Sequence, residues 1–470
     1  MQTPSPSVLK RACILGTTGC KLYLQYQWVR LTLPKERINE VMAQKLRLDV
    51  QRLGPTFIKL AQWLSLRSEL LPKEICESFE VFFDHATAIP QERVRELVEK
   101  ELKQQLGDVY LEFSEKPIGV ASIGQVHYGK LLDGTEVAIK VQKPGIQQVI
   151  ADDIACLMFL ARQFHRNPKH RPYDFPGLVK ELNNAMKKEL DFMNEGQACD
   201  RFRQNQENED NVHVPEIFWE CTTKRLLTME FIRGYKVYDI MKAVESNDRE
   251  YLERLRTENI NLDQVCDFVI YNYFKQNIVD GFFHADLHPS NILLLENGRI
   301  CYLDFGIMGE LTPKVLCVSM LFFRSIVLYD PEGVIQAFEK LGKRIPMQER
   351  LEMKHFVRLR MDMLRTYSLS EYSLSQMCYD IIVEAAKRNI SIPSSLFLCV
   401  KGMATLDGTA RKLSPNFDYE KSSQNAFRRV SLLNQIQQQP DLSSYSSFAL
   451  DMLLLNFSEF ARNVNKLLTY

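Results

Sequence analysis

The sequence has no long apolar run. A membrane-spanning helix needs about 18 to 20 consecutive apolar residues, and the best stretches of this 470-residue chain are interrupted early. The stretch that begins at Ala12 ends at Lys21, and the stretch that begins at Val315 ends at Arg324. We therefore predict that the chain has no transmembrane helix.

Paired cysteines and a net charge are also absent. The eleven cysteines include no CxxC pair and their number is odd, which argues against a disulfide framework or a zinc ribbon and favours a reducing compartment. The 59 basic residues balance the 59 acidic residues, so no overall field attracts nucleic acid. We predict a folded globular protein without a nucleic-acid partner, since 45% apolar and 25% charged residues are ordinary values.

The first 35 residues lack acidic side chains. Glu36 is the first carboxylate, whereas Lys10, Arg11, Lys21 and Arg30 all precede it. Three interpretations of this segment stay open: a transit peptide, a helix on a membrane surface, and a slightly basic docking segment. A cleavable secretory signal is not expected, because Lys21 interrupts the apolar stretch and no clear small-residue cleavage site follows.

The spacing of apolar and turn residues predicts four parts. Residues 1–106 are expected to be mainly helical, with Gly54-Pro55 opening one helix. Residues 107–235 are expected to be β-rich, with strands on both sides of the Asp133-Gly134 turn. Residues 236–436 are expected to be mostly helical apart from a hairpin at Asn297-Gly298, and residues 437–470 to form a linker and a final helix.

The strongest chemical signal lies in two short motifs. His284-Ala-Asp286 is followed five residues after its aspartate by Asn291, and Asp304-Phe-Gly begins thirteen residues after Asn291. Kinase-like catalytic loops have this arrangement. Phosphoryl transfer needs positioning and neutralisation of charge, and Mg²⁺ prefers hard oxygen ligands. We predict that Asn291 and Asp304 bind Mg²⁺, and that Asp286 orients or deprotonates an attacking hydroxyl or water.

A strand upstream of these motifs ends in a candidate ATP-binding lysine. Val137-Ala-Ile-Lys140 matches the strand whose lysine holds the α and β phosphates. Such a lysine needs a glutamate partner from a helix, and Glu189 and Glu195 are the candidates. On one continuous helix, residues six apart project about 240° from each other, so only one of the two can serve Lys140.

Two further segments are candidates for the nucleotide site. At the end of a strand expected over residues 225–232, the Glu230 carbonyl and the Ile232 N–H are predicted to bond adenine; an ordinary strand that ends in a glycine turn is the alternative. A phosphate loop is predicted at Gly119, Val120, Ala121 and Ser122. The segment from Gly119 to Gly124 has two glycines where protein kinases have GxGxxG, so nucleotide selectivity is expected to differ.

Three features together resemble the UbiB or aarF-domain (ADCK) atypical kinases. They are Lys59-Leu-Ala-Gln62 on a helix, the loop that ends in Ser122-x-Gly-Gln-Val-His127, and Glu189-Leu-Asp191. The resemblance covers roughly residues 40–415. It implies an α+β, two-lobed protein-kinase-like fold with an N-terminal helical extension and a mostly helical C-terminal lobe. It also implies ATP and Mg²⁺ as cofactors, kinase or ATPase activity, and a role in ubiquinone biosynthesis.

The resemblance further implies roles for single residues. Lys140 would hold the ATP phosphates with Glu195 as its ion-pair partner, while Lys59 and Gln62 would lie over the cleft and Glu189 would hold Lys59. Such a pair would occupy the place of a peptide substrate, which favours an ATPase or a small-molecule kinase. The resemblance also implies peripheral attachment to the bacterial cytoplasmic or the mitochondrial inner membrane, with the lipid surface and ubiquinone-biosynthesis proteins as partners.

The sequence departs from the family pattern at several positions. Ala61 stands where the family usually has glycine, Gly119-Val120 stands in place of an alanine run, and Leu287 and Ser290 alter the usual HADPHPGN loop. These departures bear on turnover more than on nucleotide binding. Two other function classes stay open: a small-molecule phosphotransferase of the aminoglycoside or choline kinase type, which lacks the Lys59 helix, and a non-catalytic nucleotide-binding scaffold.

Overall fold

The computed structural model describes residues 6–65, 73–80, 88–166, 174–342, 344–366, 372–388, 390 and 392–437. Backbone contacts divide the chain into two compact units. Unit 1 consists of Met1–Gly234 with Cys301–Ile307, and unit 2 consists of Tyr235–Ile300 with Met308–Tyr470. The four-part division expected from the sequence stays a prediction, and the linker and helix expected after residue 437 lie outside the described residues.

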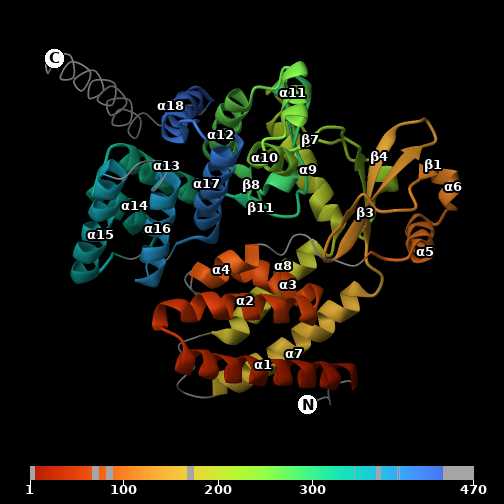
Figure 1. Ribbon diagram of the computed structural model, residues 1–470, viewed down its shortest axis with the longest axis horizontal. Helices are drawn as coiled ribbons and strands as arrows, with labels where there is room; N and C mark the ends of the chain where they lie inside the picture. Colours follow the sequence, from red (N-terminus) through yellow and green to blue (C-terminus); the bar gives the residue numbers. More distant parts are fainter. Residues whose placement is uncertain are drawn as a thin grey trace. The chain divides into compact units, whose positions relative to one another are not determined.

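The N-terminal part of unit 1 is a helical layer. It contains α1 (Pro6–Thr32), α2 (Lys35–Leu53), α3 (Pro55–Ser65) and α4 (Lys73–Glu80), which pack with α7 (Ile146–Arg166) and α8 (Phe175–Glu189) (Figure 1). Gly54 separates α2 from α3 with a φ of 98°, a backbone conformation that L side chains rarely adopt. Val50, Phe57, Ala61 and Phe79 form the core of this layer. The buried Ala61 faces this core, so the residue that departs from the family pattern is in close contact with its neighbours.

The β-rich part of unit 1 is an antiparallel sheet in the order β1-β3-β4-β6, with β2 paired to β3. The strands are β1 (Tyr110–Phe113), β2 (Gly119–Val120), β3 (Gly124–Leu131), β4 (Glu136–Gln142) and β6 (Leu226–Glu230). Val137, Ile139 and Val141 of β4 pack with Val94 and Val98 of α5 (Gln91–Leu102). Because side chains alternate along a strand, Lys140 faces the opposite side of the sheet. Helix α9 (Phe192–Asn205) contacts β6.

Unit 2 is mostly helical. Its centre is α12 (Leu262–Ile278), of which twelve residues are buried, in contact with α17 (Ser394–Leu413) and α18 (Tyr419–Gln437). Two short antiparallel pairs, β7 (Tyr235–Lys236) with β9 (Ile292–Leu294) and β8 (Phe282–His284) with β11 (Met308–Glu310), complete it. The remaining helices of unit 2 are α10 (Val237–Glu245), α11 (Arg249–Thr257), α13 (Pro313–Val327), α14 (Pro331–Leu341), α15 (Met347–Thr366) and α16 (Leu374–Lys387).

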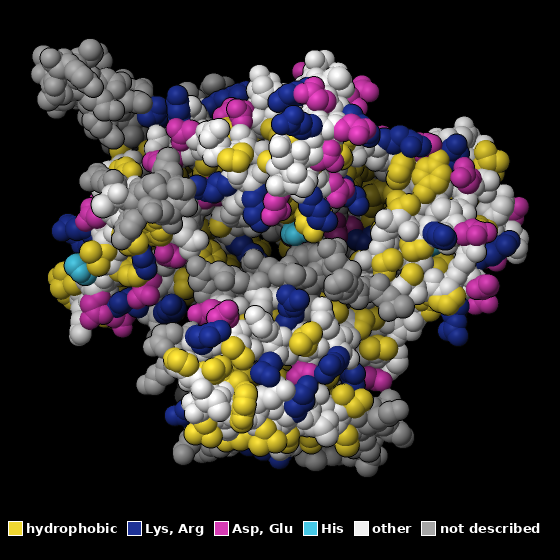
Figure 2. Space-filling model, viewed as in Figure 1, with side chains coloured by type: hydrophobic (Ala, Val, Ile, Leu, Met, Phe, Trp, Pro, Cys, Tyr) yellow, Lys and Arg dark blue, Asp and Glu magenta, His cyan; other side chains and the backbone are white. Residues whose placement is uncertain are grey.

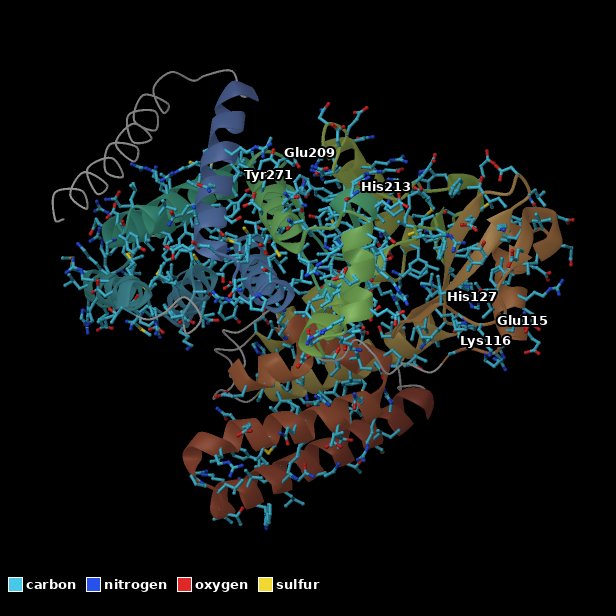
Figure 3. The ribbon with its side chains drawn as sticks, turned by 45° about the horizontal axis from the view of Figure 1, so that its top comes forward. Glu115, Lys116, His127, Glu209, His213 and Tyr271 are labelled. Carbon is cyan, nitrogen blue, oxygen red and sulfur yellow. The ribbon has the colours of Figure 1, made fainter. Side chains whose placement is uncertain are left out.

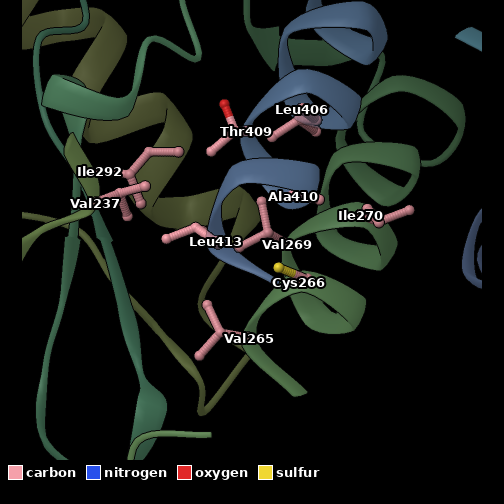
Figure 4. A pocket seen from close by; sticks show the side chains of 10 residues that line it. All are labelled: Val237, Val265, Cys266, Val269, Ile270, Ile292, Leu406, Thr409, Ala410 and Leu413. Atoms are coloured by element: carbon pink, nitrogen blue, oxygen red, sulfur yellow. The ribbon is translucent and has the colours of Figure 1, made fainter. Parts of the chain in front are cut away.

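A small cavity lies between α12 and α17. Figure 4 shows the ten side chains that surround it, and the only hydroxyl among them belongs to Thr409. A phosphate group needs cations or several N–H donors, so this apolar lining excludes it as a nucleotide site. Among the described residues, no helix combines the length and apolar character that crossing a bilayer requires. The expected α+β class, with a helical N-terminal extension and a mostly helical later part, is confirmed.

Candidate nucleotide site

Lys140 and Glu195 form a buried ion pair in unit 1. The Lys140 ammonium donates to both carboxylate oxygens of Glu195, at 2.7 and 2.9 Å. The side chains are only 12% and 7% exposed. Lys140 lies on β4 and Glu195 lies in the first turn of α9, so the pair joins the sheet to the helix that contacts it.

Asp304 brings a second carboxylate to Lys140. Its Oδ1 lies 3.6 Å from the Lys140 ammonium, and its side chain is 49% exposed, far more than that of Glu195. The backbone of Asp304 has a φ of 56°, a conformation that asparagine and aspartate tolerate better than most residues. Oδ1 also accepts the Gly306 N–H at 3.2 Å. The turn therefore holds a half-exposed carboxylate beside the buried lysine.

Glu189 does not share a helix with Glu195. Helix α8 ends at Glu189 and α9 begins at Phe192, with the side chain of Asp191 accepting the Met193 N–H as its N-cap. The interpretation that placed both glutamates on one helix was wrong, because one helix ends at Glu189 and a second helix begins after the Asp191 cap. Glu189 instead forms an ion pair with Lys59 of α3.

The two ion pairs and Asp304 influence one another. Burial alone would lower the pKa of Lys140, but the negative charges of Asp304, Glu195 and Glu189 outweigh burial and raise it above the ordinary lysine value. The same balance applies to Lys59. Burial lowers its pKa, but the negative charges of Glu189 and Asp304 outweigh burial, and the net result is a raised pKa. Burial raises the pKa of Glu195, and the nearby Lys140 ammonium opposes this. We assign ionised pairs, since each charge has an opposite charge within hydrogen-bonding distance.

Two neighbours of this cluster did not stand out in the sequence. The Lys140 ammonium lies 5.4 Å from the ring centre of Phe192, a cation–π arrangement. The buried Gln142 donates from Nε2 to the Leu190 carbonyl at 2.9 Å. That bond attaches the segment between α8 and α9 to β4. In the sequence, Gln142 stands out only by its position two residues after Lys140, and Phe192 only by its position three residues before Glu195. Neither spacing is specific.

The predicted phosphate loop is a tight turn between β2 and β3. The Ala121 N–H donates to the Gly124 carbonyl at 2.8 Å, which leaves Ser122 and Ile123 at its tip. A Cβ on Gly124 would lie 2.8 Å from the Val141 carbonyl, so the close approach of β4 requires glycine there. Gly119 has no such neighbour within 4 Å. Packing therefore requires glycine at position 124, whereas position 119 has space for other residues.

The Gln125 and His127 side chains brace the sheet beneath this loop. His127 Nε2 lies 2.7 Å from Gln125 Nε2, and Gln125 Oε1 accepts the Ile89 N–H at 2.7 Å. His127 Nδ1 donates to the Ser114 carbonyl at 2.8 Å, beside the turn that contains Glu115 and Lys116 (Figure 3). Burial lowers the pKa of His127, although its bond to the Ser114 carbonyl partly opposes this. The Ser-x-Gly-Gln-Val-His motif thus joins β1, β3 and the segment before α5.

The end of β6 offers backbone groups of the kind expected to bind adenine. The Phe231 N–H donates to the Glu136 carbonyl of β4, whereas the Glu230 N–H donates to Glu216 on the other side. Because backbone direction alternates along a strand, the Glu230 carbonyl also points away from β4. The Glu230 side chain is held 3.0 Å from His213 Nε2. The adenine contacts of Glu230 and Ile232 remain predictions.

In unit 2, Asp286 and Asn291 lie together on the predicted catalytic loop. Asn291 Nδ2 donates to the Asp286 carboxylate at 3.1 Å and to its carbonyl at 3.2 Å. These bonds orient the amide so that its Oδ1, the oxygen that a metal would require, is directed away from Asp286. His288 Nδ1 accepts the Ser290 N–H at 3.2 Å and caps the short turn that ends at Asn291. The following turn has the conformation expected of Asn-Gly, with φ of 60° at Asn297 and 71° at Gly298.

The Trp219 ring packs against α9 at Gly196, the residue that follows Glu195. A Cβ added to Gly196 would lie 2.8 Å from Cη2 of the Trp219 ring. The ring is fixed from its other end, because Trp219 Nε1 donates to the Asp200 carboxylate of α9 at 2.8 Å. Gly196 and Asp200 are one helical turn apart, so the indole lies along α9. Residues of the 3₁₀ turn Trp219–Cys221 thus set the position of the helix that presents Glu195.

Gly196→Ala is expected to weaken nucleotide binding about tenfold, because an added methyl group pushes α9 away from Trp219 and displaces Glu195 from Lys140. Binding of a fluorescent ATP analogue measures the effect. Gln197→Ala, on the exposed side of the same turn, is the control and should bind normally. The double variant Gly196→Ala/Trp219→Phe provides space for the methyl group and should recover affinity. If Gly196→Ala binds as the wild type does, Trp219 does not position Glu195.

Comparisons with known protein families agree with these motifs. The model of the ABC1 atypical kinase-like domain matches residues 81–338, and the model of the UbiB helical domain matches residues 358–418. An uncharacterised protein of Synechocystis is 30% identical over 91% of this chain and 74% of its own length. The Arabidopsis thaliana protein named ACTIVITY OF BC1 COMPLEX KINASE 7, chloroplastic, is 28% identical over 92% of this chain and 62% of its own length.

A solved structure supports the fold. The Mycobacterium tuberculosis protein Rv3197, in its complex with erythromycin, matches with a TM-score of 0.51 and 20% identity over 74% of this chain and 86% of that one. At this identity the likeness bears on the fold alone. The family models and the sequence relatives are therefore the comparisons that bear on the family of the chain.

Proposed function

Because the chain belongs to the ABC1 atypical kinase-like family, we propose that it binds Mg-ATP and transfers the γ-phosphoryl group to water or to a small acceptor. The observation that best supports this proposal is the Lys140–Glu195 pair with Asp304 3.6 Å from the same ammonium. A lysine held in place by a buried carboxylate offers the phosphates a fixed positive charge. The more exposed Asp304 would offer its carboxylate to a metal.

The donor set fits magnesium. In the part of the chain that the structure describes, no three His, Cys, Asp or Glu side chains cluster as a complete metal site. Mg²⁺ typically takes one or two protein oxygens and completes its shell with phosphate oxygens and water, and Asp304 and Asn291 are the proposed pair. The bound ion would neutralise the charge of the triphosphate. Asp286, held by the Asn291 amide, would orient the attacking hydroxyl or water.

Lys59 and Glu189 are proposed to restrict the acceptor. Both side chains are largely buried, and Lys59 interacts electrostatically with Asp304 and Lys140. The α3 helix therefore brings a second ammonium to the phosphate-binding charges. A large peptide substrate is disfavoured near these charges, whereas water or a small acceptor is not. Gln62 and Asp191 are proposed to belong to the same helix-docking arrangement, in which Asp191 caps α9.

The proposed pathway is ubiquinone biosynthesis, with peripheral attachment to a membrane. The match of the UbiB helical domain to residues 358–418 supports this choice. Deleting the gene and assaying the cellular quinones tests the pathway separately from the ATP chemistry. A loss of ubiquinone that the wild-type gene restores is expected, and an unchanged quinone content would discard the pathway.

Titration of the purified chain with ATP, with and without Mg²⁺, tests nucleotide binding. We expect Mg²⁺ to tighten binding by about tenfold or more, since Asp304 would hold the ion and the ion would offset the negative charge of the phosphates. Equal affinity in EDTA would contradict the proposed site. ATP hydrolysis should then be measured with water alone and with a panel of amino-sugars and amino-alcohols. Stimulation by those acceptors alone would favour the small-molecule phosphotransferase, and binding without any turnover would favour the scaffold.

A further inference from the structure

Arg11 of α1 contacts three other helices of the N-terminal layer. Its Nε and Nη2 both donate to the Asp153 carboxylate of α7, the second of them at 3.1 Å. Nη2 also donates to the carbonyl of Leu53, the last residue of α2. The guanidinium carbon lies 5.4 Å from the ring centre of Phe57 in the first turn of α3, a cation–π arrangement. One side chain therefore connects α1 with α7, with the end of α2 and with the start of α3.

The contacts of Arg11 lie on both sides of the turn at Gly54. The chain passes from α2 to α3 through Gly54, whose φ is 98°, and the Phe57 N–H donates to the Gly54 carbonyl at 3.0 Å. The last carbonyls of a helix have no partner within the helix, and Arg11 brings a donor and a positive charge to one of them. Arg11 thus bonds the residue before this turn and stacks on the residue three positions after it.

Burial makes Asp153 a fixed partner for Arg11. The Asp153 side chain is 1% exposed and the Arg11 side chain is 21% exposed. A buried carboxylate without its partner is strongly disfavoured, so the guanidinium stays in place. The planar fork of arginine can bond the carboxylate and the carbonyl while its face stacks on a ring, which the point charge of lysine does not reproduce. The residue type at position 11 therefore suits a contact with several helices.

Phe57 and Lys59 lie on nearly opposite sides of α3, since residues two apart on a helix project about 200° from each other. Phe57 belongs to the buried core of the helical layer, whereas Lys59 pairs with Glu189 at the end of α8. Lys59 also interacts electrostatically with Asp304 and Lys140. The rotation of α3 that is set at Phe57 thus determines where the Lys59 ammonium lies.

Lys21, a second basic residue of α1, pairs with α2. It donates to Asp49 at 2.5 Å, and the Asp49 side chain is 5% exposed. Asp49 lies one turn before the end of α2, whereas Arg11 reaches the start of α3. Because these two cations point inward, apolar side chains are prominent at the outer edge of the layer, in yellow along the lower edge of Figure 2, where α1 lies in Figure 1. Lys21 therefore offers a matched control for Arg11.

We infer that Arg11 is a positioning residue for Lys59. It holds the first turn of α3 against α7, and in this way directs the Lys59 ammonium to Glu189, beside Lys140 and Asp304. What Lys59 does for a nucleotide rests on the proposed function, whereas the placement of Lys59 by Arg11 does not. The placement is therefore tested first without nucleotide.

Amine labelling of the nucleotide-free chain measures the accessibility of Lys59. Lys59 is 17% exposed, so trace acetylation with acetic anhydride should modify it slowly in the wild type. In Arg11→Gln we expect Lys59 to react about tenfold faster, because α3 no longer holds it on Glu189. Lys140, which is 12% exposed, is the internal reference and should react as in the wild type. Lys21→Gln should leave the reaction of Lys59 unchanged.

A second variant separates positioning from stability. Arg11→Gln removes the partner of the buried Asp153 carboxylate, which destabilises the fold. Arg11→Gln/Asp153→Asn removes that unpaired charge and should still show the faster reaction of Lys59. A wild-type rate in this double variant, or a rise at Lys140 equal to that at Lys59, would overturn the inference, because either result reports a general loosening of unit 1.

Titration with Mg-ATP tests whether Arg11 acts through Lys59. Arg11→Gln should shift ATP affinity about threefold or more in the direction that Lys59→Met shifts it, and should have no further effect in a Lys59→Met background. A further change in that double variant would mean that Arg11 acts by another route and would overturn the inference. A wild-type chain that does not bind ATP would refute the proposed function alone, since labelling decides the placement of Lys59 independently.

Discussion

Asp304→Asn is expected to abolish the effect of Mg²⁺ on ATP binding and to lower ATP turnover about 100-fold or more. Asparagine keeps the size of the side chain and tolerates the φ of 56° at this position. The substitution removes the negative charge that a metal requires and that lies 3.6 Å from Lys140. Titration with ATP at several Mg²⁺ concentrations measures the first effect, and phosphate release measures the second.

The folded state of the Asp304→Asn variant should change little, since the side chain is half exposed. Asp133→Asn, in the turn between β3 and β4, is the control for replacing an exposed turn aspartate and should leave both measurements unchanged. An Asp304→Asn protein that still binds ATP more tightly with Mg²⁺ would show that the metal is held elsewhere.

Lys140→Met is expected to reduce both stability and nucleotide binding. The methionine leaves the Glu195 carboxylate, which is 7% exposed, without the charge that compensates its burial. Removing one partner of a buried pair costs about 3–5 kcal/mol. The midpoint of urea unfolding should fall accordingly, and ATP affinity should fall about 100-fold because the phosphates lose their fixed positive charge.

A second substitution separates the two effects of Lys140→Met. In Lys140→Met/Glu195→Gln the buried carboxylate becomes a neutral amide of similar size, so most of the lost stability should return. ATP binding should remain weak, because the lysine is still absent. Recovery of ATP binding in the double variant would mean that Lys140 offsets the charge of Glu195 and does not bind the phosphates, and the role proposed for Lys140 would then be discarded.

Local patterns predicted much of the structure and of the candidate site. Alternation along β4 places Val137, Ile139 and Val141 against α5 and Lys140 on the opposite face. The Asn297-Gly298 turn likewise depends on residues adjacent in the chain. One boundary was less accurate: the strand expected over residues 225–232 covers Leu226–Glu230.

The sequence by itself determined the family and the residue types of the site, because spacing along the chain is enough to specify a motif. The residues alone left open which carboxylate each lysine contacts; the resemblance implied the two pairs, and only the tertiary structure shows what brings each pair together. The Asp191 cap and the bond from Gln142 to Leu190 fix the turn that separates α8 from α9. Because the two helices have different directions, Glu189 reaches Lys59 and Glu195 reaches Lys140. Contacts between distant segments likewise bury one apolar side of α1 and leave the other exposed, a distinction that periodicity within one helix does not contain.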